Sequence, residues 1–184
     1  MSTSHLIMGE LTDYLTGQNL PDTHDERILQ KIARFLVEEK GYAKTDILSR
    51  QLMRVSVNGK TGVLSVHFII RINNFAFAVI MFGPGSVVTR QRPSLAVARL
   101  FGEDIIPYVM VTNGTDANFM DAKTGKVIGK ELNCIFSKTE ALAKTGTITP
   151  EVLSPARREK EERILYAMDI LTHYECSEYV CSLP

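Results

Sequence analysis

Three residues near the C-terminus carry side chains that bind soft metal ions. His173, Cys176 and Cys181 form an H-x2-C-x4-C pattern, and Cys134 would add a fourth ligand if the fold brought it near. Four such ligands suit zinc or an iron–sulfur cluster. The pattern itself supplies only three ligands, however, and the tyrosines between them are typical of packing residues. We therefore favour ordinary buried thiols over a metal site.

A second set of residues could bind phosphate. Arg90, Gln91, Arg92 and Arg99 follow a Gly-Pro-Gly turn, and guanidinium groups match the geometry of phosphate oxygens. The 21 Lys and Arg residues balance the 21 Asp and Glu residues, so the chain lacks the basic excess of a general nucleic-acid coater. Any contact with DNA or RNA must then come from this local patch, whose side chains we expect to be exposed. The alternative is a solvated helix surface that pairs with the acidic residues following it.

Length and composition favour one soluble domain. The chain has 184 residues, 45% of them apolar, and no apolar run near the roughly 20 residues that span a bilayer. The first ten residues do not form a secretory signal, and three cysteines are too few for a disulfide framework, which favours the cytoplasm. We expect a single domain over residues 1–184, with an N-terminal extension or short helix at 1–22, a core at 23–130 and a helical segment at 131–184.

The elements that would position these residues follow from capping and periodicity. Thr23 and Glu26 form a capping pattern before apolar residues at helical spacing, which predicts a helix over residues 25–39. A weaker apolar pattern over residues 6–15 indicates a short preceding helix, and Asn58-Gly59 predicts a β-hairpin. The other expected elements are strands over residues 53–57, 63–70, 75–82 and 108–111, a hairpin over 119–128, and helices starting near Pro93, Ser137 and Ser154. This order predicts an α/β fold in which a mixed sheet has helices on both faces.

Four segments, taken together, are characteristic of one family. They are Phe35–Tyr42 (FLVEEKGY), Val66–Ile70 (VHFII), Val79–Pro84 (VIMFGP) and Ile106–Gly114 (IPYVMVTNG). Over residues 24–130 the chain resembles the N-terminal nuclease region of type I restriction enzyme R (motor) subunits, including its stand-alone relatives. The resemblance implies a restriction-endonuclease-like fold. It also implies an aspartate on one strand and a Glu and Lys two residues apart on the next, which together hold Mg²⁺ for phosphodiester cleavage.

The chain departs from the family at these catalytic positions. The aspartate position is His67, and the Glu and Lys positions are Ile80 and Phe82. A glutamine that often follows in the family falls near Leu95. No Asp or Glu occurs between Val63 and Phe82, so we expect neither catalytic residues nor a Mg²⁺ cofactor. His67 could ligate a metal or act as a base, but a packed or hydrogen-bonded histidine is the favoured interpretation.

The sequence therefore favours a catalytically inactive nuclease-fold domain that binds nucleic acid or a protein partner, such as a component of a restriction-type system. One alternative is an active Mg²⁺-dependent endonuclease whose acidic residues come from Glu38, Glu39 or Asp46. The other is a scaffold or oligomer-forming protein, which the zero net charge favours. The sequence does not determine the ligand or the oligomeric state.

Overall fold

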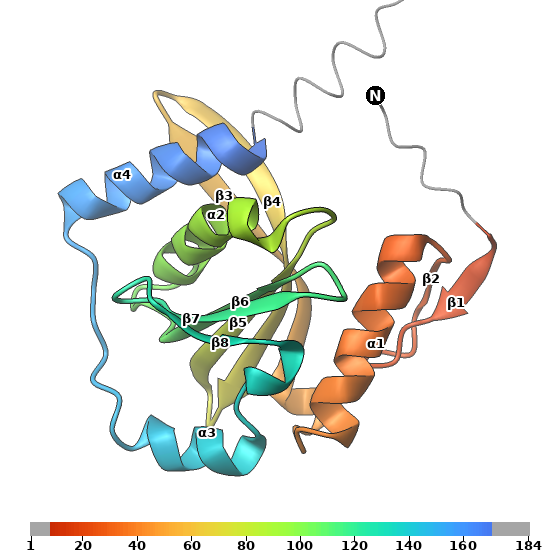
Figure 1. The fold of residues 1–184 in the computed structure, drawn as a ribbon. Helices are drawn as coiled ribbons and strands as arrows, with labels where there is room; N and C mark the ends of the chain where they lie inside the picture. Colours follow the sequence, from red (N-terminus) through yellow and green to blue (C-terminus); the bar gives the residue numbers. More distant parts are fainter. Residues whose placement is uncertain (1–7, 171–184) are drawn as a thin grey trace, which may run out of the picture.

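A computed structural model describes residues 8–170 of the chain, and Figure 1 shows its fold. A small hairpin and a long helix precede a meandering sheet whose last strands are followed by two more helices. The elements are β1 (Glu10–Thr12), β2 (Asn19–Pro21), α1 (His24–Glu38), β3 (Ile47–Val57), β4 (Lys60–Ile72), β5 (Phe75–Phe82), α2 (Val87–Leu100), β6 (Tyr108–Thr112), β7 (Ala117–Asp121), β8 (Val127–Lys130), α3 (Lys138–Thr145) and α4 (Pro155–Leu165).

The main sheet is mixed, as the sequence predicted. Its strand order is β3-β4-β5-β6-β7-β8. β5 and β6 pair in parallel, with Ala78 opposite Tyr108 and Phe82 opposite Thr112, and all other neighbours pair antiparallel. A parallel pair needs a crossover connection, which α2 provides. The order α1-β3-β4-β5-α2-β6 is therefore the helix, three strands, helix and strand expected from the sequence.

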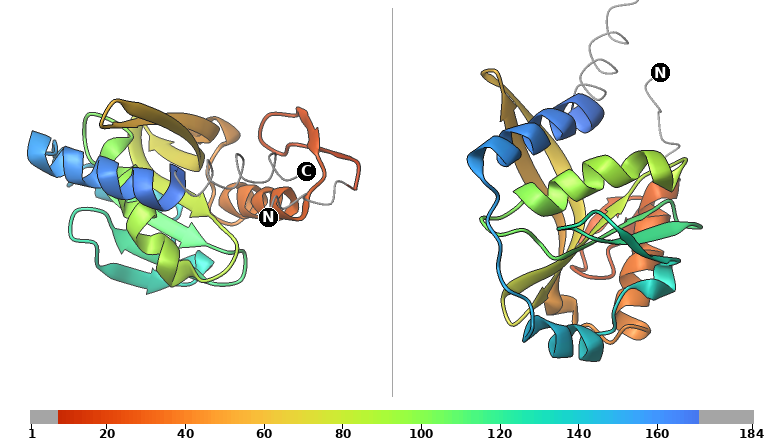
Figure 2. Two further views of the ribbon diagram at one scale, coloured as in Figure 1. Left: turned by 90° about the horizontal axis from the view of Figure 1, so that it is seen from above. Right: turned by 60° about the vertical axis from the view of Figure 1, so that its left-hand side comes forward.

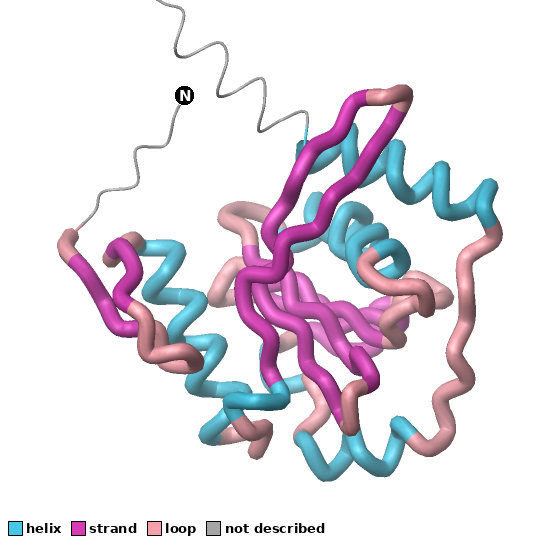
Figure 3. The backbone as a smooth tube through the Cα atoms, turned by 180° about the vertical axis from the view of Figure 1, so that it is seen from behind, coloured by secondary structure: helices cyan, strands magenta, loops and turns pink. Residues whose placement is uncertain are grey.

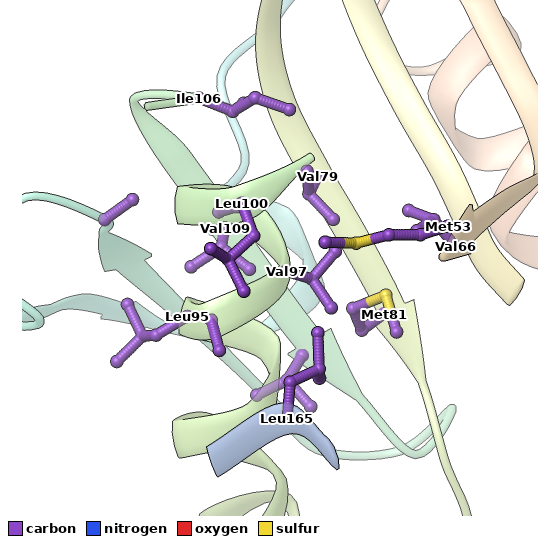
Figure 4. Packing of buried hydrophobic residues seen from close by; sticks show 14 of the residues in the cluster. Met53, Val66, Val79, Met81, Leu95, Val97, Leu100, Ile106, Val109 and Leu165 are labelled. Carbon is purple, nitrogen blue, oxygen red and sulfur yellow. The ribbon is translucent and has the colours of Figure 1, made fainter. Parts of the chain in front are cut away.

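Helices cover both faces of this sheet (Figure 2). α2 and α4 lie on one face, where β5 contributes Val79 and Met81 to the apolar core shown in Figure 4. α1 and α3 lie on the other face, where β5 contributes Ile80 and Phe82 to a second core. Because side chains alternate along a strand, β5 is buried on both faces, which explains its continuous apolar sequence.

Helix α1 begins and ends within one residue of its predicted bounds. The Thr23 hydroxyl accepts a hydrogen bond from the backbone N–H of Glu26 at 3.1 Å, which caps the first turn. Its buried face consists of Leu29, Ile32, Ala33 and Leu36, at helical spacing. Helix α2 differs more, because it begins at Val87 and contains Pro93 in its interior rather than in its first turn. Arg90 and Arg92 therefore lie on a helix and not in the preceding loop.

The short helix predicted over residues 6–15 is wrong. Residues 10–12 form β1, which pairs antiparallel with β2. The Asp13 carboxylate accepts hydrogen bonds from the backbone N–H and the hydroxyl of Thr16, at 3.2 and 2.6 Å. Such a side-chain-to-backbone turn competes with helix formation, and Gly17 completes it with a φ of 76°.

The β3–β4 hairpin is longer than predicted and extends beyond the rest of the sheet (Figure 3). Its turn residues Asn58 and Gly59 have φ values of 51° and 77°, as a two-residue turn of this type requires. The pairing between β4 and β5 stops at Phe68 and Ile80, so the part of the hairpin beyond Phe68 has no β5 neighbour.

The C-terminal segment is helical in part, as predicted, with α3 and α4 joined by an extended connection. A short π-helical stretch, Tyr166–Ile170, follows α4. The candidate ligands His173, Cys176 and Cys181 lie outside the described residues. Within residues 8–170, no helix is both long enough and apolar enough to cross a membrane.

We predict that Ile80→Glu abolishes folding or destabilises the domain by about 4 kcal/mol or more, because Ile80 is 0% exposed and the new carboxylate would lack a partner. Val88→Glu is the matched control, because Val88 is 65% exposed and should change stability by less than about 0.5 kcal/mol. Chemical denaturation followed by circular dichroism measures both. An Ile80→Glu protein as stable as the control would show that this position reaches solvent.

Candidate functional site

The three family positions meet where β4 and β5 separate. His67 lies one residue beyond the last β4–β5 pair, and Ile80 and Phe82 lie on the β5 face that packs towards α1. Ile80 is completely buried and Phe82 is 9% exposed. The His67 ring contacts the Phe82 ring edge-on, with centroids 6.0 Å apart and an interplanar angle of 84°. Apolar side chains therefore occupy the place where the family has a carboxylate and a lysine.

His67 satisfies a backbone group that the separating strands leave unpaired. The backbone N–H of Phe82 donates a hydrogen bond to Nδ1 of His67 at 3.2 Å. Nδ1 must therefore be the unprotonated nitrogen, which places the ring proton on Nε2. A metal bound at Nδ1 would displace the backbone N–H, and a metal bound at Nε2 would displace the proton. This hydrogen bond supports the interpretation of His67 as a structural histidine.

The electrostatic environment keeps His67 neutral. Burial, with smaller contributions from the charges of Arg50 and Arg90, lowers the pKa of His67 to about 4, and Asp25 only partly opposes them. At neutral pH the ring carries no charge, and a proton could be gained only at Nδ1, where the Phe82 N–H donates. His67 therefore lacks the properties of a general base.

A polar cluster beside this site was not found from the sequence. Arg50 forms ion pairs with Glu26 and, at 3.3 Å, with Asp13, while the Gln30 amide donates to both carboxylates at 2.7 and 2.8 Å. Burial acts to raise the pKa of Asp13, but hydrogen bonds from Gln30 and Thr16 and the charge of Arg50 outweigh it and lower this pKa. Both carboxylates are thus engaged in holding the N-terminal hairpin to α1 and β3.

Arg50 owes its position to an irregularity in β3. Its φ is 51°, and the pairs Ser49–Phe68 and Gln51–Val66 are formed on either side of it while the Arg50–His67 pair is missing. The only signal in the sequence was a lone arginine before the predicted strand. Across residues 8–170, no group of three or more His, Cys, Asp or Glu side chains is placed to hold a metal ion. The donor set at this site therefore does not fit Mg²⁺ as the family would bind it.

The acidic residues considered as replacements lie elsewhere. Glu38 accepts a hydrogen bond from the Tyr14 hydroxyl at 3.0 Å, and Glu39 is the C-cap of α1. Asp46 pairs with Lys138 at 2.8 Å. A rise of 1.5 Å per residue places Glu38 about 18 Å along the α1 axis from Glu26, which lies beside Arg50. Glu38 and Glu39 are therefore too distant to join His67 in one site, and Asp46 is engaged by Lys138.

The expected exposed arginine patch is wrong in one essential respect. The Arg99 side chain is 7% exposed, donates to the carbonyl oxygen of Ala122 at 2.8 Å and pairs with Glu161 at 2.8 Å. Arg92 pairs with the other oxygen of Glu161 at 2.6 Å. Arg90 pairs with Asp169 at 3.3 Å, and the neighbouring Gln91 is partly exposed.

The acidic partners of these arginines come from the end of the chain, and not from the residues that follow α2 as the sequence suggested. Glu161 is 3% exposed. One buried carboxylate thus joins two arginines of α2 to α4. These ion pairs hold α2 against α4, and the positive charges of the arginines are largely compensated.

Two further sequence features have structural roles. The Thr-Asn-Gly end of β6 is tied to the loop before α2, because the Asn113 amide donates to the carbonyl oxygen of Gly85 at 2.8 Å. Gly114 has a φ of 94°, and a Cβ there would lie 2.7 Å from Ile28 of α1.

Cys134 is exposed, so the expectation of a buried thiol is wrong for this residue.

Acidification should test His67. Since its pKa is lower in the folded than in the unfolded chain, the stability it contributes is complete above pH 6.5 and is lost as the pH falls to about 4. We expect this group to account for a loss on the order of 3 kcal/mol. His67→Gln should remove that part of the pH dependence, whereas exposed His24→Gln should retain it. Denaturant unfolding from pH 7 to 4 measures the difference, and equal slopes in all three proteins would contradict the assignment.

The buried ion pair gives a second test. Glu161→Ala should destabilise the domain by about 3–5 kcal/mol, because it leaves the buried Arg99 charge without its partner. Glu159→Ala removes an exposed pair with Arg163 on the same helix and should cost less than about 0.5 kcal/mol. Thermal and urea unfolding distinguish the two. Equal, small effects would mean that Arg99 is solvated.

Comparison with known proteins agrees with this architecture. The family described as Type I restriction enzyme R protein N terminus (HSDR_N) matches residues 24–135, from the start of α1 to the end of the sheet and more than half of the chain. Neither the search of curated proteins nor the search of solved structures found a match. The chain belongs to the family of type I restriction enzyme R protein N-terminal domains.

Proposed function

We propose that this domain binds nucleic acid without hydrolysing it. The observation that carries the proposal is the packing at the family's catalytic positions, where Ile80 and Phe82 are core residues and His67 is bound to a backbone N–H. Hydrolysis in this fold needs carboxylate oxygens that hold Mg²⁺ and a cation near the phosphate. The apolar side chains of Ile80 and Phe82 supply neither a carboxylate oxygen nor a cation, so we infer that the domain does not hydrolyse phosphodiester bonds.

The charge distribution supports nucleic acid as the ligand. From Ile47 to Gly102 the chain contains no Asp or Glu, and this segment builds β3, β4, β5 and α2. It contains seven basic residues, namely Arg50, Arg54, Lys60, Arg71, Arg90, Arg92 and Arg99. Four of these side chains pair with acidic residues of other elements, but Arg54 and Lys60 are exposed in a segment without acidic residues, as expected for a local phosphate-binding surface. Membership in a restriction-enzyme family favours DNA over other polyanions.

A protein-binding role is the second candidate. β8 is an edge strand of the main sheet, and Val127 and Ile128 on it are 40% and 49% exposed. An exposed apolar edge can add a strand from a partner or from a second copy. A partner within a restriction-type system and a cytoplasmic location both stay predictions.

The purified protein should not cleave DNA or RNA with Mg²⁺ or Mn²⁺, yet should bind a short DNA duplex at low salt. The double variant Asp13→Asn/Glu26→Gln removes the two carboxylates that pair with Arg50 and tests whether they substitute for the missing ones. Gel-based cleavage and fluorescence anisotropy measure the two properties on the same samples. Metal-dependent cleavage that survives repurification and disappears in the double variant would replace this proposal with an active nuclease.

A further inference from the structure

The β3–β4 hairpin presents one covered face and one open face. Its inner face contributes Met53, Val55 and Val66 to the core under α2 and α4. Ile170 packs so closely on this face that a Cβ at Gly62 would lie 2.1 Å from it. The projecting part of the hairpin is therefore held in place by the body of the domain, although β5 does not extend alongside it.

The open face carries alternate residues of both strands. The cross-strand pairs on it are Leu52 with Ser65, Arg54 with Val63, and Ser56 with Thr61. All six residues are exposed, and Leu52 and Val63 are 74% and 48% exposed. The hydroxyls of Ser56 and Thr61 lie 2.8 Å apart. The face thus combines hydroxyl groups, two apolar side chains and a cation, and it has no acidic group.

Within residues 47–102, charge compensation elsewhere leaves the hairpin with exposed basic residues that have no acidic partner. Of the seven basic residues in the acid-free segment, four pair with acidic residues: Arg50, Arg90, Arg92 and Arg99. The Nε atom of Arg71 is buried. Arg54 and Lys60 are exposed and have no acidic partner among residues 8–170. Both lie on the hairpin, Arg54 on its open face and Lys60 beside its turn, where pairing with Val57 places Lys60 on the other face.

We propose that the open face of the β3–β4 hairpin is the surface that contacts duplex DNA, as a two-stranded ribbon in the major groove. The inference rests on the nucleic-acid binding proposed above and assigns its location. A major groove about 12 Å wide admits a two-stranded ribbon. Arg54 and Lys60 contact phosphates, and the hydroxyls of Ser56 and Thr61 donate to phosphate or base-edge acceptors. Leu52 and Val63 make apolar contacts, for which the thymine methyl group is the matching feature of the groove.

Charge favours DNA over a second copy of this chain as the occupant. A dimer formed through this face would bring the Arg54 side chains of the two copies into one interface, and the face has no acidic group to compensate them. Two phosphate contacts predict weak binding whose logarithmic salt dependence has a slope of about −1.8. Affinity should then fall about tenfold between 50 and 200 mM salt.

The test compares Arg54→Gln/Lys60→Gln with Lys126→Gln/Lys130→Gln in the full chain. The control lysines are also exposed and without an acidic partner in the described residues, but they lie at the β8 end of the sheet. Anisotropy with a fluorescent 20-base-pair DNA duplex at several salt concentrations should show that the hairpin variant loses at least about tenfold in affinity at 50 mM salt and most of the slope, while the control keeps both. Circular dichroism should show unchanged melting for both variants.

Other outcomes of these experiments distinguish the hairpin assignment from the more general proposal of nucleic-acid binding. Equal duplex affinity in the two variants would overturn the hairpin assignment and leave nucleic-acid binding standing, whereas no binding by the wild-type protein would overturn both. A-form RNA has a major groove too narrow for side chains to read, so RNA binding as tight as DNA binding would overturn the groove geometry. A wild-type dimer that Leu52→Asp dissociates in light scattering would assign this face to self-association instead.

Discussion

The burial of β5 on both faces is the constraint on which the rest of the structure depends. Val79 and Met81 belong to the core beneath α2 and α4, while Ile80 and Phe82 belong to the core beneath α1. An ionised side chain on such a strand is costly unless a metal or an opposite charge compensates it. Apolar residues at the two family positions avoid that cost and complete the core beneath α1.

β5 carries no charged residue, and the acidic residues that pair with the central arginines lie on elements outside the sheet. The N-terminal hairpin and α1 provide Asp13 and Glu26, which hold Arg50 at one end of the site. The C-terminal helix α4 provides Glu161, which holds Arg92 and Arg99 on the other face of the sheet. Basic residues of the central segment thus become attachment points for the first and last elements. This arrangement explains why a chain of zero net charge has so uneven a distribution of charge.

Local sequence patterns predicted most helices, strands and turns, but they did not predict side-chain partners that are distant in the sequence. The capping pair at Thr23, the turn at Asn58-Gly59 and the apolar run of β5 each depend on neighbours in sequence, and each was found. The burial of Arg99 depends on Glu161, 62 residues later, and no local pattern marks such a partner. The turn at Asp13 was missed because apolar spacing alone suggested a helix, whereas a short polar side chain competing for the backbone decided the outcome. The burial of Ile80 and Phe82 was predictable because the family resemblance located these positions residue by residue.

The family's catalytic position on β4 and the proposed DNA-contacting surface are separable in this fold because they occupy different parts of the strand. His67 lies where β4 leaves β5, and Val63 lies four residues further along the strand, about 13 Å away at the usual rise per residue. Packing around Phe82 determines the first position, whereas contacts of the hairpin with α4 and Ile170 determine the second. Substitutions that fill the catalytic position therefore do not disturb the hairpin, and the acid-free sequence of both strands remains compatible with a polyanion. The surface proposed to contact DNA therefore keeps its shape and charge independently of the side chains at the family's catalytic positions.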